Sequence, residues 1–196
     1  MKAEPVPYST VASFTPGAHV SRIRQNDKAK ACRFYATEQF MSDCWQPGNT
    51  INGDKEQVVR PTQAVLSVRT GDVVISLIHG KAAIVSPEHA GRLLSNNYVR
   101  VEVDGSKVVP AWFVWHFNES RESRHQQALA TQGSTFVLRL SLTEVRQFTV
   151  TLPPLNKQQA IGGLYLATIE KRHYQERLAA LNEQQILSQL SDMIQS

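Results

Sequence analysis

The spacing of hydrophobic and polar residues changes once along the chain, and the change divides the chain into two parts. Before residue 152, apolar residues alternate with polar ones or form short continuous runs, both of which are typical of β-strands. After residue 155 they recur every three or four positions, as on one face of a helix. The sequence therefore predicts an α+β fold: a mixed α/β domain over residues 1–152, followed by a long coiled-coil-type helix over residues 153–196.

The first part contains four segments with the pattern of strands, which are 64–68, 73–78, 98–103 and 136–142. The first two are continuous apolar runs joined at Thr70-Gly71-Asp72, and the last two alternate. In the last segment, the residues expected on the inner face are Phe136, Leu138, Leu140 and Leu142. Residues 16–62 lack clear periodicity, so we expect loops and short strands there, with a hairpin around Asn52-Gly53.

An aromatic cluster marks a predicted helix that begins at Pro110, because proline suits the first helical position. The helix turns polar towards Gln127. Its aromatic residues are Trp112, Phe113, Trp115 and Phe117. Aromatic rings can stack on nucleic-acid bases, but rings at helical spacing more often belong to a core, and we interpret these as core residues.

The boundary between the two parts lies at Leu152-Pro153-Pro154-Leu155, since two prolines can continue neither a helix nor a central strand. Asn156 is a good N-cap, and Gln159 is placed to return a hydrogen bond to it. The spacing predicts one helix of about 38 residues, roughly 55–60 Å long. Gly162-Gly163 is its weak point and marks either a bend or the close approach of another helix.

One narrow apolar stripe runs along this predicted helix. Its residues are Ile161, Leu164, Leu178, Leu181, Leu187, Leu190 and Ile194. A helix of this length cannot lie wholly on a domain of about 150 residues, so its distal half needs a partner helix. The alternative is a frayed tail, but a tail has no reason to keep the helical period.

The composition is that of a folded chain, since 41% of the 196 residues are hydrophobic and only 19% are charged. No apolar stretch approaches the ~18–20 residues of a membrane helix, and the N-terminus has no signal-peptide pattern. Cys32 and Cys44 are too few for a disulfide framework. We therefore expect a cytoplasmic protein with no membrane partner.

The formal net charge of +4 lies entirely in the first part. Residues 1–155 contain 17 Lys and Arg against 13 Asp and Glu, whereas residues 156–196 contain four of each class. Such a surplus fits a polyanionic partner, although an ordinary basic surface has the same composition.

Motifs for catalysis are missing from the sequence. The two cysteines are twelve residues apart and the six histidines are scattered, so no zinc pattern forms, and no P-loop, G-x-G-x-x-G or G-x-S-x-G motif occurs. Leu152-Pro153-Pro154-Leu155 lacks the polar first residue and the closing aromatic of the amino-methyltransferase signature. We expect a protein that is not an enzyme and that has no catalytic residue, no cofactor and no metal.

Several short motifs occur in the order found in the specificity subunits of type I restriction–modification systems, which the chain resembles over about residues 60–196. They are Arg69-Thr70-Gly71-Asp72-Val73-Val74-Ile75-Ser76, His79-Gly80-Lys81, Leu94-Ser95-Asn96-Asn97, Val109-Pro110-Ala111-Trp112-Phe113, Gly133-Ser134-Thr135 and Leu152-Pro153-Pro154-Leu155-Asn156-Lys157-Gln158-Gln159-Ala160-Ile161. The last is the most specific, because it is similar to the family's entry into its long conserved helix. The first 60 residues match only loosely.

The resemblance implies a function that does not require catalysis. Specificity subunits normally contain two target-recognition domains, each followed by a long helix, and the two helices pair antiparallel. Each domain reads one half of a split target in double-stranded DNA. DNA methyltransferase subunits bind the specificity subunit, and a restriction subunit can join them.

This chain has one recognition domain and one long helix, which is half of the family's pattern. Two copies could pair through residues 156–196 and read a palindromic site, or one copy could pair with a different half. An inactive remnant is a further alternative, and so is a protein-interaction module, such as an assembly scaffold or a restriction inhibitor.

The resemblance and the charge together indicate candidate DNA contacts. Arg22, Arg24 and Lys28 are candidates for phosphates, and Gly80 and Lys81 form a loop in which the backbone can approach DNA. The candidates for base edges or phosphates are Asn96, Asn97, Ser134 and Thr135, with Gly133 beside them. Ordinary surface or turn positions, with Gly80 and Gly133 as turn glycines, are the alternative.

Overall fold

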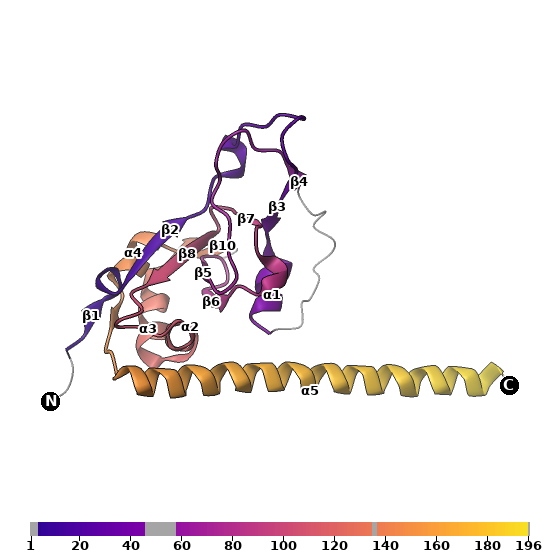
Figure 1. Cartoon of the computed structure of the whole chain (residues 1–196). Helices are drawn as coiled ribbons and strands as arrows, with labels where there is room; N and C mark the ends of the chain where they lie inside the picture. The colour runs from indigo at the N-terminus through magenta and orange to yellow at the C-terminus, as the bar shows by residue number, and fades with distance from the viewer. Residues whose placement is uncertain (1–3, 46–57, 135–136, 196) are drawn as a thin grey trace.

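The structure, a computed structural model, describes residues 4–45, 58–134 and 137–195 of the chain (Figure 1). The α-helices are α1 (Thr37–Asp43), α2 (Pro110–Glu119), α3 (Arg121–Ala130), α4 (Leu142–Gln147) and α5 (Leu155–Gln195). The 3-10 turns are η1 (Tyr8–Thr10), η2 (Val20–Arg22) and η3 (Pro87–His89). The strands are β1 (Val6–Pro7), β2 (Ala12–Pro16), β3 (Cys32–Tyr35), β4 (Val58–Val59), β5 (Val73–Ser76), β6 (Lys81–Ile84), β7 (Leu93–Leu94), β8 (Tyr98–Val103), β9 (Thr131–Ser134), β10 (Val137–Leu140) and β11 (Thr149–Val150). The predicted α+β class, with a long C-terminal helix, is confirmed.

An antiparallel sheet of four strands, in the order β2-β8-β5-β6, forms the centre of the domain. Val101 of β8 lies opposite Phe14 of β2 on one side and Val73 of β5 on the other. All four residues of β5 are buried, as the continuous apolar run predicts. A smaller sheet, β4-β3-β7, contains the one parallel pair assigned among the described strands, β3 with β7.

The aromatic side chains of α2 lie in the core and not on the surface, which confirms the expectation for this helix. Trp112, Phe113 and Phe117 are each at most 2% exposed and pack with Tyr8 and Phe148. Figure 1 shows α2 and α3 between the central sheet and α5. The aromatic helix therefore forms the layer to which the long helix attaches.

A buried glutamine fastens the start of α5 to the domain. Gln158 is fully buried; its Nε2 donates to the carbonyl oxygens of Lys107 and Pro153, both at 2.8 Å. Its Oε1 accepts the backbone N–H of Val109 at 2.9 Å. One side chain thus satisfies three main-chain groups, two of them just before α2 and one at the proline boundary. The helix begins at Leu155, so the N-cap predicted at Asn156 lies one residue inside it.

Gly162 marks a close approach between helices and not a bend. A Cβ at this position would lie 2.5 Å from the backbone nitrogen of Trp112 and 2.9 Å from the Cβ of Ala111. Real Cβ atoms do not approach that closely, so α2 and α5 require glycine where they touch. At Gly163 an added Cβ would meet nothing within 4 Å.

Four predicted elements differ from the structure, and one of them is the strand predicted over 73–78, which ends at Ser76. The predicted helix from Pro110 to Gln127 is two helices, because Ser120 is extended and its Oγ accepts the backbone N–H of Ser123, which caps α3. The strand predicted over 136–142 ends at Leu140, because Ser141 caps α4 and Leu142 is its first residue. The segment 64–68 is not a strand: it hydrogen-bonds to residues 91–94 and forms only an isolated bridge, between Ser67 and Leu93.

Some predictions fall outside the described residues. These are the hairpin at Asn52-Gly53 and the inward position of Phe136. Within residues 4–45, 58–134 and 137–195, no helix is long and apolar enough to cross a membrane.

Candidate nucleic-acid interface

Two turns of the domain and the end of strand β10 meet at one end of the central sheet. The β5–β6 turn begins at Leu77, whose backbone N–H donates to the carbonyl of Asn97 in the β7–β8 turn at 2.9 Å. The carbonyl of Leu77 in turn accepts the N–H of Leu140 on β10 at 2.8 Å. We call this cluster, residues 77–81, 95–97, 131–134 and 137–140, the turn face. It brings together candidates that are far apart in the sequence.

Arg139 of β10 holds the turn face together through its side chain. Its guanidinium donates from Nη1 to Oδ1 of Asn97 at 3.3 Å and from Nη2 to the carbonyl of Asn96. The side chain of Asn97 is therefore engaged within the protein, while both asparagines are half-buried. Arg139 was not among the sequence candidates, although the alternation of 136–142 places it on the outer face, opposite Leu140.

A hollow of about 320 Å³ lies beside Arg139, between the β5–β6 turn, α3 and β10. Its lining residues are Leu77, Ile78, His79, Gly80, Arg124, Gln127, Ala128, Arg139 and Leu140. Two of the nine are arginines and none is acidic, so the hollow favours an anion.

Gly80 has a φ of +60°, which a glycine adopts without strain at this turn. The turn requirement accounts for the glycine, as the alternative interpretation held. Lys81 follows as the first residue of β6 and is half-buried. Burial and the charge of Lys81 lower the pKa of His79, so this histidine is neutral at pH 7.

The β9–β10 hairpin carries the remaining candidates of the turn face. Gly133 and Ser134 are the last two residues of β9, and their main chains pair with Leu138 and Val137 of β10. Thr135 lies outside the described residues.

The basic residues of the N-terminal part lie elsewhere. Arg22, Arg24 and Lys28 are exposed on a protrusion that extends away from the central sheet (Figure 1). The protrusion is joined to the segment before β5, since the carbonyl of Arg24 accepts the N–H of Thr62 at 3.0 Å. This pairing brings Arg60 to the protrusion, where its side chain donates to the carbonyl of Ala29. Arg60 was not among the candidates identified in the sequence.

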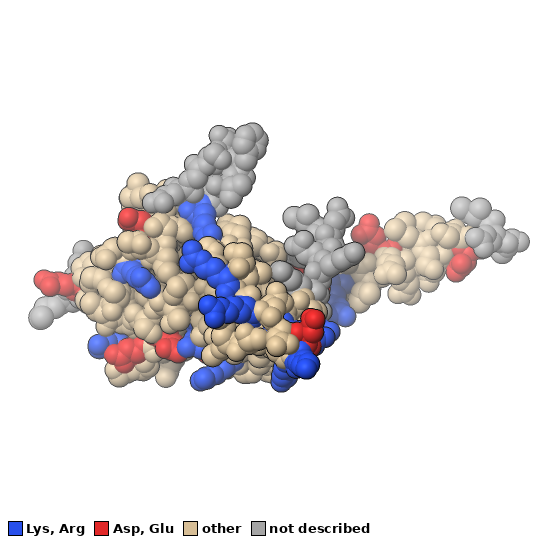
Figure 2. All heavy atoms as spheres, turned by 90° about the horizontal axis from the view of Figure 1, so that it is seen from above, with Lys and Arg blue, Asp and Glu red and all other residues tan. Residues whose placement is uncertain are grey.

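Seen from above, a row of Lys and Arg side chains crosses the domain (Figure 2). The visible distal part of α5 shows acidic and neutral side chains instead. The view agrees with the sequence counts, which place the whole positive surplus before residue 156.

A buried polar cluster near α1 has the residue types of a catalytic relay but not its geometry. Asp43 Oδ1 lies 2.8 Å from Nδ1 of His89, and Oγ of Ser86 lies 3.1 Å from that same nitrogen. A relay needs the nucleophile and the carboxylate on opposite ring nitrogens. Asp43 also accepts from the Tyr35 hydroxyl at 2.6 Å and from the Ser86 N–H, so the cluster ties α1 to η3. Across the described ranges, no group of three or more His, Cys, Asp and Glu could hold a metal ion.

The apolar stripe of α5 divides between the domain and solvent. Ile161 is half-buried and packs on the core with Tyr165, so the domain itself already covers part of this side chain. Five residues of the predicted stripe are more than half exposed, which are Leu164, Leu178, Leu181, Leu187 and Leu190. The side chain of Ile194 is not described. Three further exposed apolar residues, missed in the sequence, are Tyr174, Ile186 and Met193.

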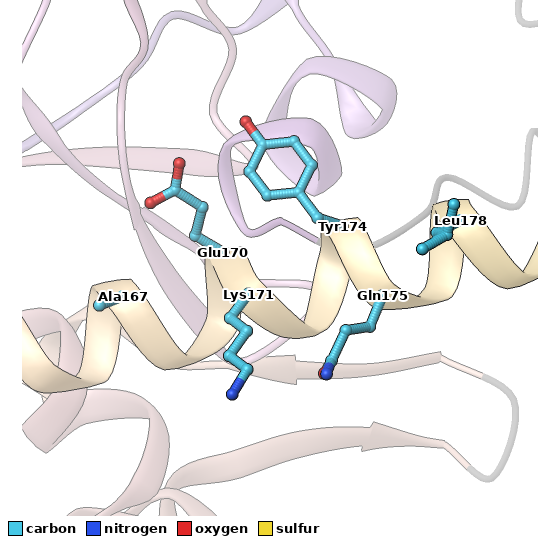
Figure 3. A pocket seen from close by; sticks show the side chains of 6 residues that line it. All are labelled: Ala167, Glu170, Lys171, Tyr174, Gln175 and Leu178. Atoms are coloured by element: carbon cyan, nitrogen blue, oxygen red, sulfur yellow. The ribbon is translucent and has the colours of Figure 1, made fainter.

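A groove of about 400 Å³ runs along the middle of α5 and is lined by this helix alone (Figure 3). Glu170 and Tyr174 point to one side and Lys171 and Gln175 to the other. The lining residues are Ala167, Glu170, Lys171, Tyr174, Gln175 and Leu178, which follow the spacing of a coiled-coil hole.

Comparisons with known proteins identify the fold. No family model and no curated protein matches the sequence. The HsdS subunit from Thermoanaerobacter tengcongensis superposes with a TM-score of 0.62 at 16% identity, covering 93% of this chain and 46% of that one. A structure from work on complex assembly and conformational transition of the type I R-M system gives 0.63 at 17%, covering 94% and 46%. The S subunit from M. genitalium gives 0.54 at 11%, covering 92% and 41%.

The chain therefore has the fold of one half of a type I restriction–modification specificity subunit, and it spans less than half the length of these three structures. The fold expected from the sequence motifs is confirmed, including the long helix that follows the α/β domain.

Proposed function

We propose that this protein is a non-catalytic DNA-recognition subunit that directs partner enzymes of a type I restriction–modification system to one half of a split target. The observation that carries the proposal is the shared fold, which extends over more than nine-tenths of the chain and includes both the domain and the helix. The domain of residues 1–152 supplies the DNA-reading surface, and the helix of residues 153–196 supplies the contact with a partner helix. The protein acts in the cytoplasm, where its DNA target lies.

The turn face and the protrusion are the two parts of the proposed DNA surface. Arg22, Arg24 and Lys28 are exposed and have long side chains that can reach phosphates. Phosphate contacts fix the position of a protein on the duplex without reading the sequence. Asn96 and Asn97 lie in the β7–β8 turn, where side chains can reach base edges, and Ser134 at the end of β9 is the further candidate for a base contact.

A second copy of the chain is the proposed occupant of the exposed face of α5. The apolar residues along the distal half are more than half exposed, and residues 156–196 as a whole carry four positive and four negative charges, so this segment has no net charge to oppose the pairing of two copies. Each solved structure is about twice the length of this chain, which is the size two copies provide. A different half-subunit would bind the same face.

DNA methyltransferase subunits are the proposed enzymatic partners, with a restriction subunit joining them. The chain itself supplies recognition and spacing.

A tagged pull-down from the native host, followed by mass spectrometry, tests the proposal. Recovery of a DNA methyltransferase subunit is the expected result. A direct titration with duplex DNA against salt accompanies it, because each phosphate contact contributes about −0.9 to the slope of log K against log salt. The competing function is that of a protein-interaction module. Recovery of partner proteins without salt-dependent binding to DNA would support that function and overturn DNA recognition.

A further inference from the structure

Arg139 is a half-buried cation whose hydrogen-bond partners are neutral. They are the amide oxygen of Asn97 and the carbonyl oxygen of Asn96. Among the described residues, no carboxylate forms an ion pair with it. Partial burial weakens the hydration of a charge, and neutral acceptors replace only part of that hydration. The site is therefore electrostatically incomplete without an anion.

The other arginine of the same hollow shows the contrast. Arg124 pairs with the carboxylate of Glu119 and also donates from Nε to the carbonyl of Asn118. Its charge is neutralised within the protein. The unneutralised positive charge of the hollow therefore belongs to Arg139.

His79 adds a neutral donor to the hollow. Oγ of Ser76 accepts the backbone N–H of His79 at 3.2 Å and lies 2.8 Å from its Nδ1. A Ser76 hydroxyl that donates to Nδ1 leaves the proton of the neutral ring on Nε2. Burial and Lys81 lower the pKa of His79, which agrees with this neutral tautomer. Nε2–H has no acceptor among the described residues.

We infer that the hollow beside Arg139 binds one phosphate of the DNA backbone, with the Arg139 guanidinium as the principal ligand. The inference rests on the proposed function and deepens it, because it names a residue and a ligand group. Arg139 also holds the Asn96–Asn97 turn, so a phosphate bound here fixes the position of that turn on the duplex. Ile78 lines the hollow and is 44% exposed. It would therefore lie beside the DNA strand whose phosphate is bound there.

The main test compares the salt dependence of duplex DNA binding in wild type and Arg139→Gln, with Arg177→Gln on the exposed part of α5 as control. We expect the slope of log K against log salt to become less steep by about 0.9 in Arg139→Gln, the value of one phosphate. Arg177→Gln should keep the wild-type slope. A role of Arg139 that is only structural would lower affinity with an unchanged slope, and that result would overturn the inference.

A second pair of variants leaves every bond of Arg139 intact. Ile78→Glu places a carboxylate at the rim, and Ile78→Gln is its uncharged match. We expect Ile78→Glu to bind duplex DNA at least tenfold more weakly than Ile78→Gln at low salt. Equal affinities would overturn the inference.

Two further outcomes separate the possible failures. If wild type itself shows no salt-dependent binding to DNA, the proposed function fails and the inference fails with it. If inorganic phosphate raises the melting temperature of wild type but not of Arg139→Gln, while the DNA slopes of the two are equal, the hollow is a site for free phosphate. That outcome overturns the inference and leaves the proposed function standing.

Discussion

The backbone nitrogen of Trp112 occupies the space that a Cβ on Gly162 would need, at a distance of 2.5 Å. The α/β domain and the long helix therefore touch through their main chains at this point. The contact fixes the direction in which α5 leaves the domain, and with it the position of the proposed DNA surface relative to a partner helix.

Gly162→Ala should destabilise the protein by about 1–3 kcal/mol, because α2 and α5 must separate to admit the methyl group. Gly163→Ala is the matched control, since its Cβ would meet nothing within 4 Å. There the change should stabilise by about 0.5–1 kcal/mol through helix propensity. Urea unfolding of both variants measures the difference, and equal effects at the two glycines would contradict the close contact.

Gln158→Leu should lower the free energy of unfolding by about 2–3 kcal/mol. The change leaves the N–H of Val109 and the carbonyls of Lys107 and Pro153 without their side-chain partner. Gln159→Leu, on the neighbouring exposed position, should change stability by less than about 0.5 kcal/mol. Thermal or urea unfolding distinguishes them, and similar losses in both would show that the buried bonds contribute little.

The predictable parts of the fold are those that depend on local pattern. The helix after Pro154 and the strand Tyr98–Val103 follow from spacing alone, and Pro110 correctly predicts the start of α2. The pattern does not reveal the break at Ser120, because helical spacing continues across it. The break depends on a cap, in which the Ser120 hydroxyl accepts the N–H of Ser123.

The turn face could be predicted only in part, because its assembly depends on long-range contacts. Gly80, Asn96 and Ser134 were identified one motif at a time. Arg139 joins β10 to the Asn96–Asn97 turn through hydrogen bonds that span more than forty residues, and no local signal encodes such a bond. The alternation around it shows only that its side chain points away from Leu140.

Leu181→Asp together with Leu190→Asp should convert a dimer of this chain to a monomer. Both side chains are more than half exposed, and two charges on each helix would be buried unpaired in the paired state. Gln184→Asp together with Ser191→Asp adds the same charge at exposed polar positions one heptad apart, which lie away from both leucines, and should leave the dimer intact. Light scattering gives the mass of each variant. The same mass for wild type and the leucine variant would argue against pairing through these residues.

Acidification should destabilise the domain through His116. Burial lowers the pKa of this histidine, and its Nδ1 lies 2.8 Å from the Tyr8 hydroxyl, which donates to the neutral ring. The unfolded chain therefore binds more protons, so stability is lost as the pH falls below about 6.5 towards the lower pKa of the folded state. His116→Gln should show a smaller loss of melting temperature between pH 7.5 and 5.5, both values being about one unit from the unfolded pKa. An unchanged pH dependence in the variant would assign the acid loss to other groups.

The proposed DNA contacts should fall into two classes when substituted. Lys81→Ala and Arg22→Ala remove charges and should weaken binding to all sequences alike, each making the salt slope less steep by about 0.9. Asn96→Ala and Ser134→Ala should instead relax the preference at particular bases, at a cost of about 1–3 kcal/mol for the preferred sequence. Selection of binding sites from a random duplex pool, repeated for each variant, measures preference separately from affinity. If all four variants select and bind as wild type does, DNA recognition must use another surface of the domain, because these residues sample both the turn face and the protrusion.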